Sequence, residues 1–275
     1  MTPHKKPQNV LLTIAGFDPS SGAGVTADLA VFAALGCFGV SCITALTVQS
    51  TLGVEATHPV AGDIVAATLD CLNRDIPAAG VKIGMLATEA NVGAVASFLE
   101  RLNPRPVVVL DPVLRSSSGR ELLSPEGVRR MQERLLPLVD WVTPNLDELA
   151  VLTGLPVGSR MEMAAAAGVL QERFPGLTVL ATGGHLDPPD DLLLQPLYEG
   201  IWLPGVRVES SSTHGTGCAL SSALLAWLVR GNSALEAAQA AKQYVTEAIR
   251  RAPGLGGGHG PLGHYWPLQP DSIRQ

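Results

Sequence analysis

Short apolar segments alternate with longer amphipathic ones along most of this 275-residue chain, and this alternation limits the possible folds more than any other feature. Continuous apolar runs are typical of strands buried on both faces, and helices between such strands make the strands parallel. The sequence predicts strands at residues 10–15, 40–48, 80–83, 106–110, 141–143 and 178–181.

The segments between these runs have helical periodicity. Helices are predicted at residues 24–35, 64–74, 90–102, 124–139, 146–153, 160–174, 218–229 and 234–250. After residue 184 the pattern changes: residues 184–196 read as a mobile loop, and 192–202 with 206–209 as an antiparallel hairpin. The prediction is an α/β protein of three layers, α/β/α, around a mostly parallel sheet. One domain is expected over residues 1–275, with flexible tails at 1–9 and 267–275.

The charge and cysteine content exclude several classes of protein. A net charge of −6, with no basic cluster beyond Lys5 and Lys6, argues against binding to nucleic acid. No apolar run reaches the roughly 18 residues that a membrane span needs, so no membrane partner is expected. The four cysteines show no Cys-x-x-Cys spacing, which favours reduced thiols in a cytoplasmic protein.

A glycine-rich loop connects the first predicted strand to the first predicted helix. Gly22, Gly24 and Ala27 satisfy the pattern G-x-G-x-x-G/A of dinucleotide-binding proteins. That interpretation needs an acidic residue about 20 positions later, and none lies between Asp28 and Glu55. We therefore reject NAD binding. The loop still leaves the carboxyl end of a strand, which is the edge where open α/β sheets bind ligands.

The segment "SSTHGTGCALSSALLAW", which begins at residue 211, places glycines and a cysteine at the start of a helix. Gly215, Thr216, Gly217 and Cys218 can present successive N–H groups to an anion. An ordinary helix cap by Thr213 or Thr216 is the alternative, and spacing alone favours neither. Cys218 favours the anion site, because a thiol at a helix N-terminus is expected to have a lowered pKa. No P-loop pattern occurs.

Several motifs in order carry a resemblance to a known family. "TIAGFDPSSGAGVTADL", "ITALTVQSTLGV", "KIGML", "LDPVL", "VTPNLDE", "GGH", "THGTGCALSSAL" and "GHGPL" span nearly the whole chain. Together they resemble the hydroxymethylpyrimidine/phosphomethylpyrimidine kinases of thiamine biosynthesis, in the ribokinase-like superfamily. Most sugar kinases of that superfamily have an aspartate where this chain has Cys218.

The resemblance implies ATP-dependent phosphorylation of 4-amino-5-hydroxymethyl-2-methylpyrimidine and then of its monophosphate. It implies that Gly215, Thr216, Gly217 and Cys218 face the transferred phosphoryl group and that Cys218 takes the hydroxyl proton. The other implied site residues are Gly16, Ala23, Asp28, Gln49 and Met85 around the pyrimidine, Asn145, Thr182, Gly184 and Lys242 at ATP, and Asp111 and Glu148 at Mg²⁺.

One position departs from the family. Members often have a lysine before "GGH", where this chain has Thr182, and Arg115 or Lys242 are candidates to replace that charge. The alternatives are a pyridoxal kinase, whose substrate is also a flat ring with a hydroxymethyl group, and a pyrimidine-binding protein without activity. The superfamily commonly forms dimers, so a homodimer is expected.

Overall fold

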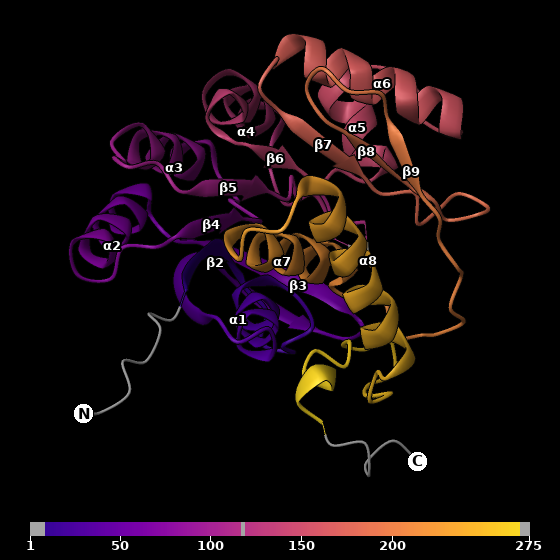
Figure 1. Ribbon diagram of the computed structural model, residues 1–275. Coiled ribbons are helices and arrows are strands. Elements are labelled where there is room, and N and C mark those ends of the chain that lie inside the picture. The colour runs from indigo at the N-terminus through magenta and orange to yellow at the C-terminus, as the bar shows by residue number, and fades with distance from the viewer. Residues whose placement is uncertain (1–8, 117–118, 270–275) are drawn as a thin grey trace, which may run out of the picture.

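The computed structural model describes residues 9–116 and 119–269. Within them the chain forms a nine-stranded sheet of order β3-β2-β1-β4-β5-β6-β7-β8-β9 (Figure 1). The pairs β2–β3, β7–β8 and β8–β9 are antiparallel, and the remaining pairs are parallel. The strands are β1 (Val10–Phe17), β2 (Phe38–Ser50), β3 (Gly53–Pro59), β4 (Gly80–Ile83), β5 (Val107–Leu110), β6 (Trp141–Val142), β7 (Thr178–Ala181), β8 (Asp191–Leu194) and β9 (Ile201–Leu203).

Helices cover both faces of the sheet, so the molecule has the three layers predicted (Figure 1). Successive strand residues point to opposite faces: Leu12 and Ile14 join one core cluster, and Leu11 joins the other. The first cluster packs under α2 (Gly62–Asp75), α3 (Glu89–Glu100), α4 (Pro125–Arg130), α5 (Leu146–Thr153) and α6 (Arg160–Arg173), and the second under α1 (Gly24–Ala34), α7 (Thr216–Val229) and α8 (Ala234–Arg250).

The predicted strands and helices are confirmed, with a few corrections. Strand β3 was not predicted; its residues are half-buried or exposed at the sheet edge. Residues 206–209 form no strand. The predicted helix at 124–139 is α4 followed by a π-helix (Met131–Leu135) and a 3₁₀ turn (Leu136–Leu138).

Two segments expected to be flexible also differ. The expected loop at 184–196 contains the largely buried strand β8. Most of the expected tails lie outside the described residues, but a 3₁₀ turn (Trp266–Leu268) occupies the start of the second, and Trp266 Nε1 donates to Tyr244 O. No helix in the described ranges is both long and apolar enough to cross a membrane.

The strand order brings several loops to one edge of the sheet. β1, β4, β5, β6 and β7 are parallel, so their carboxyl ends lie together. The glycine loop at 18–24 follows β1, Asp111 follows β5, and Thr182 follows β7. The first turn of α7 reaches the same edge, since a Cβ on Gly217 would lie 3.6 Å from Asp111 Oδ2.

A fully buried ion pair connects β4 to α1 beneath this edge. Lys82 Nζ lies 2.9 Å from Asp28 Oδ2 and 3.0 Å from Oδ1, and both side chains have 0% exposure. Asp28 also accepts hydrogen bonds from Thr13 Oγ1 in β1 and Ser222 Oγ in α7. Burial lowers the pKa of Lys82, but the attraction of Asp28, with Cys218 and Asp111, raises it overall. The ammonium therefore stays charged.

Replacing Lys82 with methionine should lower the free energy of unfolding by about 3–5 kcal/mol, because it leaves Asp28 buried without a counter-charge. Arg101→Ala is the control: Arg101 pairs with Asp70 at 2.7 Å, but both side chains are about half exposed, so the loss should stay below about 1 kcal/mol. Urea unfolding followed by circular dichroism measures both. Equal losses would contradict the importance of the buried pair.

Candidate active site

The first turn of α7 presents unpartnered backbone N–H groups at the carboxyl edge of the sheet. Gly215 precedes the helix with φ of 81°, and a Cβ there would lie 1.9 Å from Gly22 O, so only glycine fits. Within the described residues, the N–H groups of Gly215, Thr216, Gly217 and Cys218 donate to no protein acceptor. No side chain caps the helix, which argues against the ordinary cap. Four free N–H groups at a helix N-terminus suit an anion.

Asp111, a buried carboxyl group, lies beside this turn, and a second buried carboxyl group, that of Glu148, interacts with Asp111. Burial raises the pKa of Asp111, and Asp28 raises it further, against the opposing effects of Lys82, Ser221 and the Cys218 thiol. Burial, and after it the negative charge of Asp111, raises the pKa of Glu148 to about 8. A divalent cation would relieve this repulsion, and Mg²⁺ takes few carboxylates because it keeps several waters. These two residues therefore fit the predicted magnesium site.

Glu148 is held in place by the start of α5. Its Oε2 accepts from Asn145 N at 2.9 Å, and Asn145 Oδ1 accepts from Glu148 N at 2.9 Å, which makes a capping box. Asn145, predicted at ATP, also forms a β-bridge with Thr182 where β6 and β7 end. The structure thus brings Asn145, Glu148 and Thr182 together.

The predicted lowering of the Cys218 pKa is wrong. Burial raises the pKa of this half-buried thiol to about 12, and the carboxylates of Asp111 and Asp28 add to the rise. Lys82 and the Gly24 N–H oppose it without overcoming it. The partial charge of the helix terminus is a smaller effect than the loss of water around the sulfur. Cys218 is therefore a neutral thiol at physiological pH.

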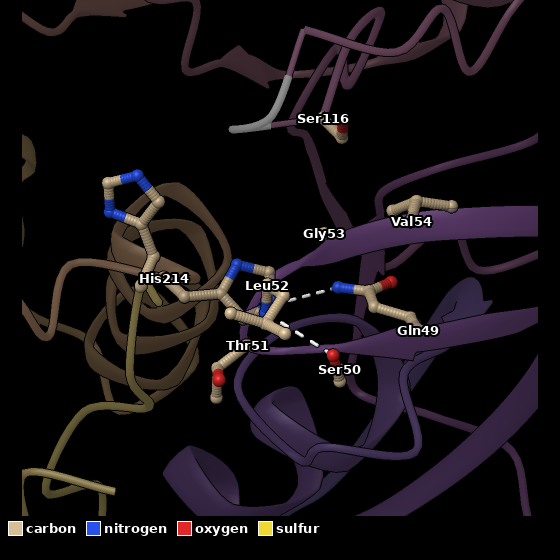
Figure 2. Close-up of a pocket in the computed structure, with 9 residues that line it drawn as sticks. Gln49, Ser50, Thr51, Leu52, Gly53, Val54, Ser116 and His214 are labelled. Atoms are coloured by element: carbon tan, nitrogen blue, oxygen red, sulfur yellow. Dashed lines mark hydrogen bonds between the residues drawn. The ribbon is translucent and has the colours of Figure 1, made fainter. Parts of the chain in front are cut away.

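A small hollow opens beside His214, the residue that precedes the turn (Figure 2). Gln49, predicted to contact the pyrimidine, lies in its wall with His214. The other lining residues are Ser50, Thr51, Leu52, Gly53, Val54, Ser116 and His259.

The other residues predicted at the pyrimidine lie close to one another but outside that lining. Gly16 packs against Met85, since a Cβ on Gly16 would lie 2.9 Å from Met85 Sδ. Met85 is itself buried, with 7% exposure. The Ala23 N–H already donates to Asp18 Oδ2 at 3.0 Å, and its carbonyl accepts from Thr26 Oγ1 at 3.0 Å.

Asp28, predicted to contact the substrate, is engaged within the protein, so that contact stays a prediction. Its side chain has 0% exposure, and both carboxylate oxygens are engaged by Lys82. Thr13 and Ser222 occupy its remaining faces. Asp28 instead supports α7 and β4 from beneath the site.

Lys242 and Arg115 are the two candidates to replace the lysine that related proteins often have at the position of Thr182. Lys242 Nζ lies 2.6 Å from Asp191 Oδ2 and donates to Pro189 O at 3.1 Å, so its charge is paired within the protein. Arg115 is exposed. Next to Gly184, the Gly183 N–H donates to Asp191 Oδ1, so Asp191 ties this loop to Lys242. The assignments of Lys242 and Gly184 to ATP stay predictions.

Sequence reasoning missed three residues that organise the site: Asp18, Lys82 and His214. Lys82 left a signal, because a lysine inside the apolar strand "GVKI" requires a buried partner. Asp18 begins an Asp-Pro-Ser-Ser turn, which indicates side-chain bonds to the following amides. The pairing of Asp18 with His214, 196 positions away, left no local signal.

The family model and the curated relatives agree on one family. The family model described as phosphomethylpyrimidine kinase matches residues 18–263. A hydroxymethylpyrimidine/phosphomethylpyrimidine kinase of Rhizobium meliloti (strain 1021) is 42% identical over 262 residues, which cover 93% of this chain and 97% of that protein. The Escherichia coli (strain K12) protein of the same description is 43% identical, with coverages of 92% and 96%.

Solved structures of two kinds are similar to this fold. A phosphomethylpyrimidine kinase from Clostridium difficile 630 has a TM-score of 0.76 and 36% identity, covering 88% of this chain and all of that one. Pyridoxal kinase from Staphylococcus aureus in complex with ADP has a TM-score of 0.86 and 31% identity, covering 94% of each chain. The fold is therefore more similar to that of the pyridoxal kinase, whereas the sequence is more similar to that of the phosphomethylpyrimidine kinase.

The raised pKa of Cys218 predicts slow alkylation. At pH 8 only about one thiol in ten thousand is ionised when its pKa is about 12, so iodoacetamide should modify Cys218 at least tenfold more slowly than the exposed Cys71. The Cys218 rate should keep rising with pH up to at least 11. Mass spectrometry of tryptic peptides gives both rates, with Cys71→Ser as the control. Similar rates at pH 8 would show that the thiol is not protected.

Proposed function

The chain belongs to the phosphomethylpyrimidine kinase family, and from this membership we propose that it phosphorylates 4-amino-5-hydroxymethyl-2-methylpyrimidine with ATP and then phosphorylates the resulting monophosphate. Members of this family are phosphotransferases. The observation that carries the proposal is the position of the free N–H groups of Gly215 to Cys218 beside Asp111, directly after His214, which lines the same hollow as Gln49. Product analysis by mass spectrometry after incubation with ATP and the pyrimidine alcohol tests it.

The N–H groups of the first turn would stabilise the transferred group. A phosphoryl group passes through a loose transition state whose charge spreads over its equatorial oxygens. Donors fixed in advance around those oxygens lower the barrier because they need no reorganisation. Asp111 and Glu148 would hold Mg²⁺, which would supply positive charge to the triphosphate.

Cys218 would act on the acceptor hydroxyl as a neutral thiol. Its S–H is hydrogen-bonded to Asp111, so the sulfur keeps lone pairs with which it can accept a hydrogen bond from that hydroxyl and orient it. As the acceptor oxygen bonds to phosphorus, its proton would pass to an oxygen of the transferred phosphoryl group, and the sulfur stays neutral throughout the step.

A neutral thiol also suits the second phosphorylation. The monophosphate has a second pKa near 6, so it arrives mostly as a dianion and needs no base. A carboxylate at position 218 would repel it by about 4 kcal/mol, for unit charges about 4 Å apart at an effective dielectric constant of about 20. It would also add a negative charge beside Asp111 and Asp28, whose carboxylates already raise the pKa of the Cys218 thiol.

Cys218→Asp should therefore lower kcat/KM for the monophosphate at least tenfold more than for the alcohol. Cys218→Ser is the matched control: it removes the sulfur but adds no charge, so the ratio between the two substrates should stay near the wild-type value. Steady-state kinetics on each purified substrate gives the numbers. Equal losses in the aspartate variant would refute the charge argument.

Substitution of Thr182 tests the proposed ATP-binding residues. Thr182→Lys should lower KM for ATP about fivefold, because one cation would be added beside the Asn145 loop and the existing Lys242 charge is held by Asp191. Thr182→Gln, which is long but uncharged, should leave KM nearly unchanged. If both variants behave alike, the added charge does not reach the triphosphate.

A pyridoxal kinase is the second candidate, because the backbone resembles that of the Staphylococcus aureus enzyme. Values of kcat/KM for pyridoxal and for the pyrimidine alcohol, measured side by side, decide between them. An inactive binding protein is the third, with Thr182 in its favour, and the absence of ADP release would identify it. The single domain, the homodimer and the cytoplasmic location stay proposals.

A further inference from the structure

The motif "GHGPL" at residues 258–262 has no part in the chemistry proposed above, yet it lies against the chain that leads into the first turn of α7. The Gly260 N–H donates to Ser211 O at 3.3 Å, and the His214 N–H donates to Gly260 O at 3.2 Å. His214 also belongs to a parallel β-bridge with this motif. Gly260 therefore holds both ends of the segment 211–214, and the turn begins at the next residue.

The contact at Gly260 leaves no space for a side chain. A Cβ there would lie 2.7 Å from Ser212 Oγ and 2.8 Å from Leu255 O, closer than such atoms approach in folded proteins. Ser212 is itself buried, with 2% exposure. The main chain at Gly260 is therefore in direct contact with the segment that it holds, and an atom added there must displace one of the two.

The chain after this glycine is fixed to α8. The Gly263 N–H donates to Ala248 O at 2.9 Å, and the Tyr244 hydroxyl donates to His264 O. Residues 258–264, the C-terminal segment, are thus attached to a core helix at one end and to the start of α7 at the other. The position of α8 therefore helps to determine where the first turn of α7 lies.

The side chain of His214 is held from the opposite direction. Its Nε2 lies 2.7 Å from Asp18 Oδ2, with side-chain exposures of 12% for the histidine and 5% for the aspartate. The ring also lies directly against Gly22, since a Cβ there would be 2.3 Å from His214 Cδ2. The glycine loop therefore fixes the ring while Gly260 fixes the main chain, and neither contact can shift without moving the residue that precedes the turn.

We propose that the C-terminal segment is a positioning element for phosphoryl transfer: through Gly260 and His214 it aims the free N–H groups of the first turn of α7 at the transferred group. Gly260 acts through His214, so it is a positioning residue and not a catalytic one. The inference rests on the proposed function for the identity of the transferred group. It also gives the motif "GHGPL" a role, because the contact with Ser212 requires glycine at position 260.

Misplaced N–H groups should slow the chemical step and leave substrate binding nearly unchanged. These groups face charge that develops during the transfer, so they stabilise the transition state more than the bound substrates. A displacement of about 1 Å can lower a rate by about a hundredfold. A segment that served stability alone would lower the free energy of unfolding without lowering kcat of the folded protein.

The test compares Gly260→Ala with Gly257→Ala. Neither glycine has a positive φ, and a Cβ at position 257 would meet only Leu52 Cδ2, at the ordinary contact distance of 3.7 Å. In Gly260→Ala we expect kcat for the pyrimidine alcohol and for its monophosphate to fall at least about tenfold, with KM values within about twofold of the wild type. Gly257→Ala should resemble the wild type. Equal kcat in the two variants, or a loss confined to KM, would overturn the proposal.

If circular dichroism shows that Gly260→Ala does not fold, Tyr244→Phe takes its place. This change removes the hydroxyl that holds the C-terminal segment on α8 and leaves the buried His264 carbonyl without that donor, but it adds no atom near the turn. We expect kcat to fall by about twofold to tenfold at nearly unchanged KM. A wild-type kcat in Tyr244→Phe would overturn the proposal.

A second measurement needs no pyrimidine substrate. In nitrogen-15 NMR of the wild type, inorganic phosphate should shift the amide signals of Gly215 and Gly217. Half-saturation should need the same phosphate concentration in Gly257→Ala and a concentration at least about fivefold higher in Gly260→Ala. No shift in the wild type, or equal half-saturation in all three proteins, would overturn the proposal. If the phosphate results hold but neither pyrimidine compound is phosphorylated, the proposed substrate is wrong and the positioning role stands.

Discussion

One buried ammonium group, that of Lys82, lies among the acidic groups on which the candidate active site depends. It pairs with Asp28 and lies close enough to Asp111 and Cys218 to oppose the rise in their pKa values. Without it, two carboxylates and a thiol would share a dry interior with no cation in contact. The same ammonium fixes α1 to β4 and, through Ser222 and Asp28, fixes α7 as well. The stability of this interior and the electrostatics of the site thus have a common origin.

Helix α7 connects the buried ion pair of Lys82 and Asp28 to the proposed phosphoryl site. Its first turn supplies the free N–H groups, Ser221 one turn further bonds Asp111, and Ser222 bonds Asp28. Gly215 allows the turn to touch Gly22, so the phosphoryl end and the glycine loop are in van der Waals contact. A rotation of α7 would move the N–H groups and the thiol relative to both carboxylates, and the bonds from Ser221 and Ser222 oppose such a rotation.

What the sequence could and could not predict follows from the range of the interactions. Apolar strands, helix starts and the free N–H groups at Gly215 depend on neighbours in the chain, so local pattern was sufficient. Strand β3 was missed because an edge strand lacks the continuous apolar run of a buried one. The Cys218 pKa was wrong because it depends on burial and on Asp111 and Asp28, which are distant in sequence. The pairing of Asp18 with His214 is equally non-local.

Substrate choice in this fold has to come from a few side chains. The backbone is shared with a pyridoxal kinase, so the layers, the anion-binding turn and the carboxylates serve phosphoryl transfer to more than one ring. An amide such as Gln49 is symmetric in shape, and alone it would accept two opposite hydrogen-bond patterns. It gains specificity only when its neighbours remove one orientation. Thr47 donates to the Gln49 amide oxygen at 3.1 Å and His214, paired with Asp18, lies 3.0 Å from the amide nitrogen, so recognition also depends on neighbours of Gln49.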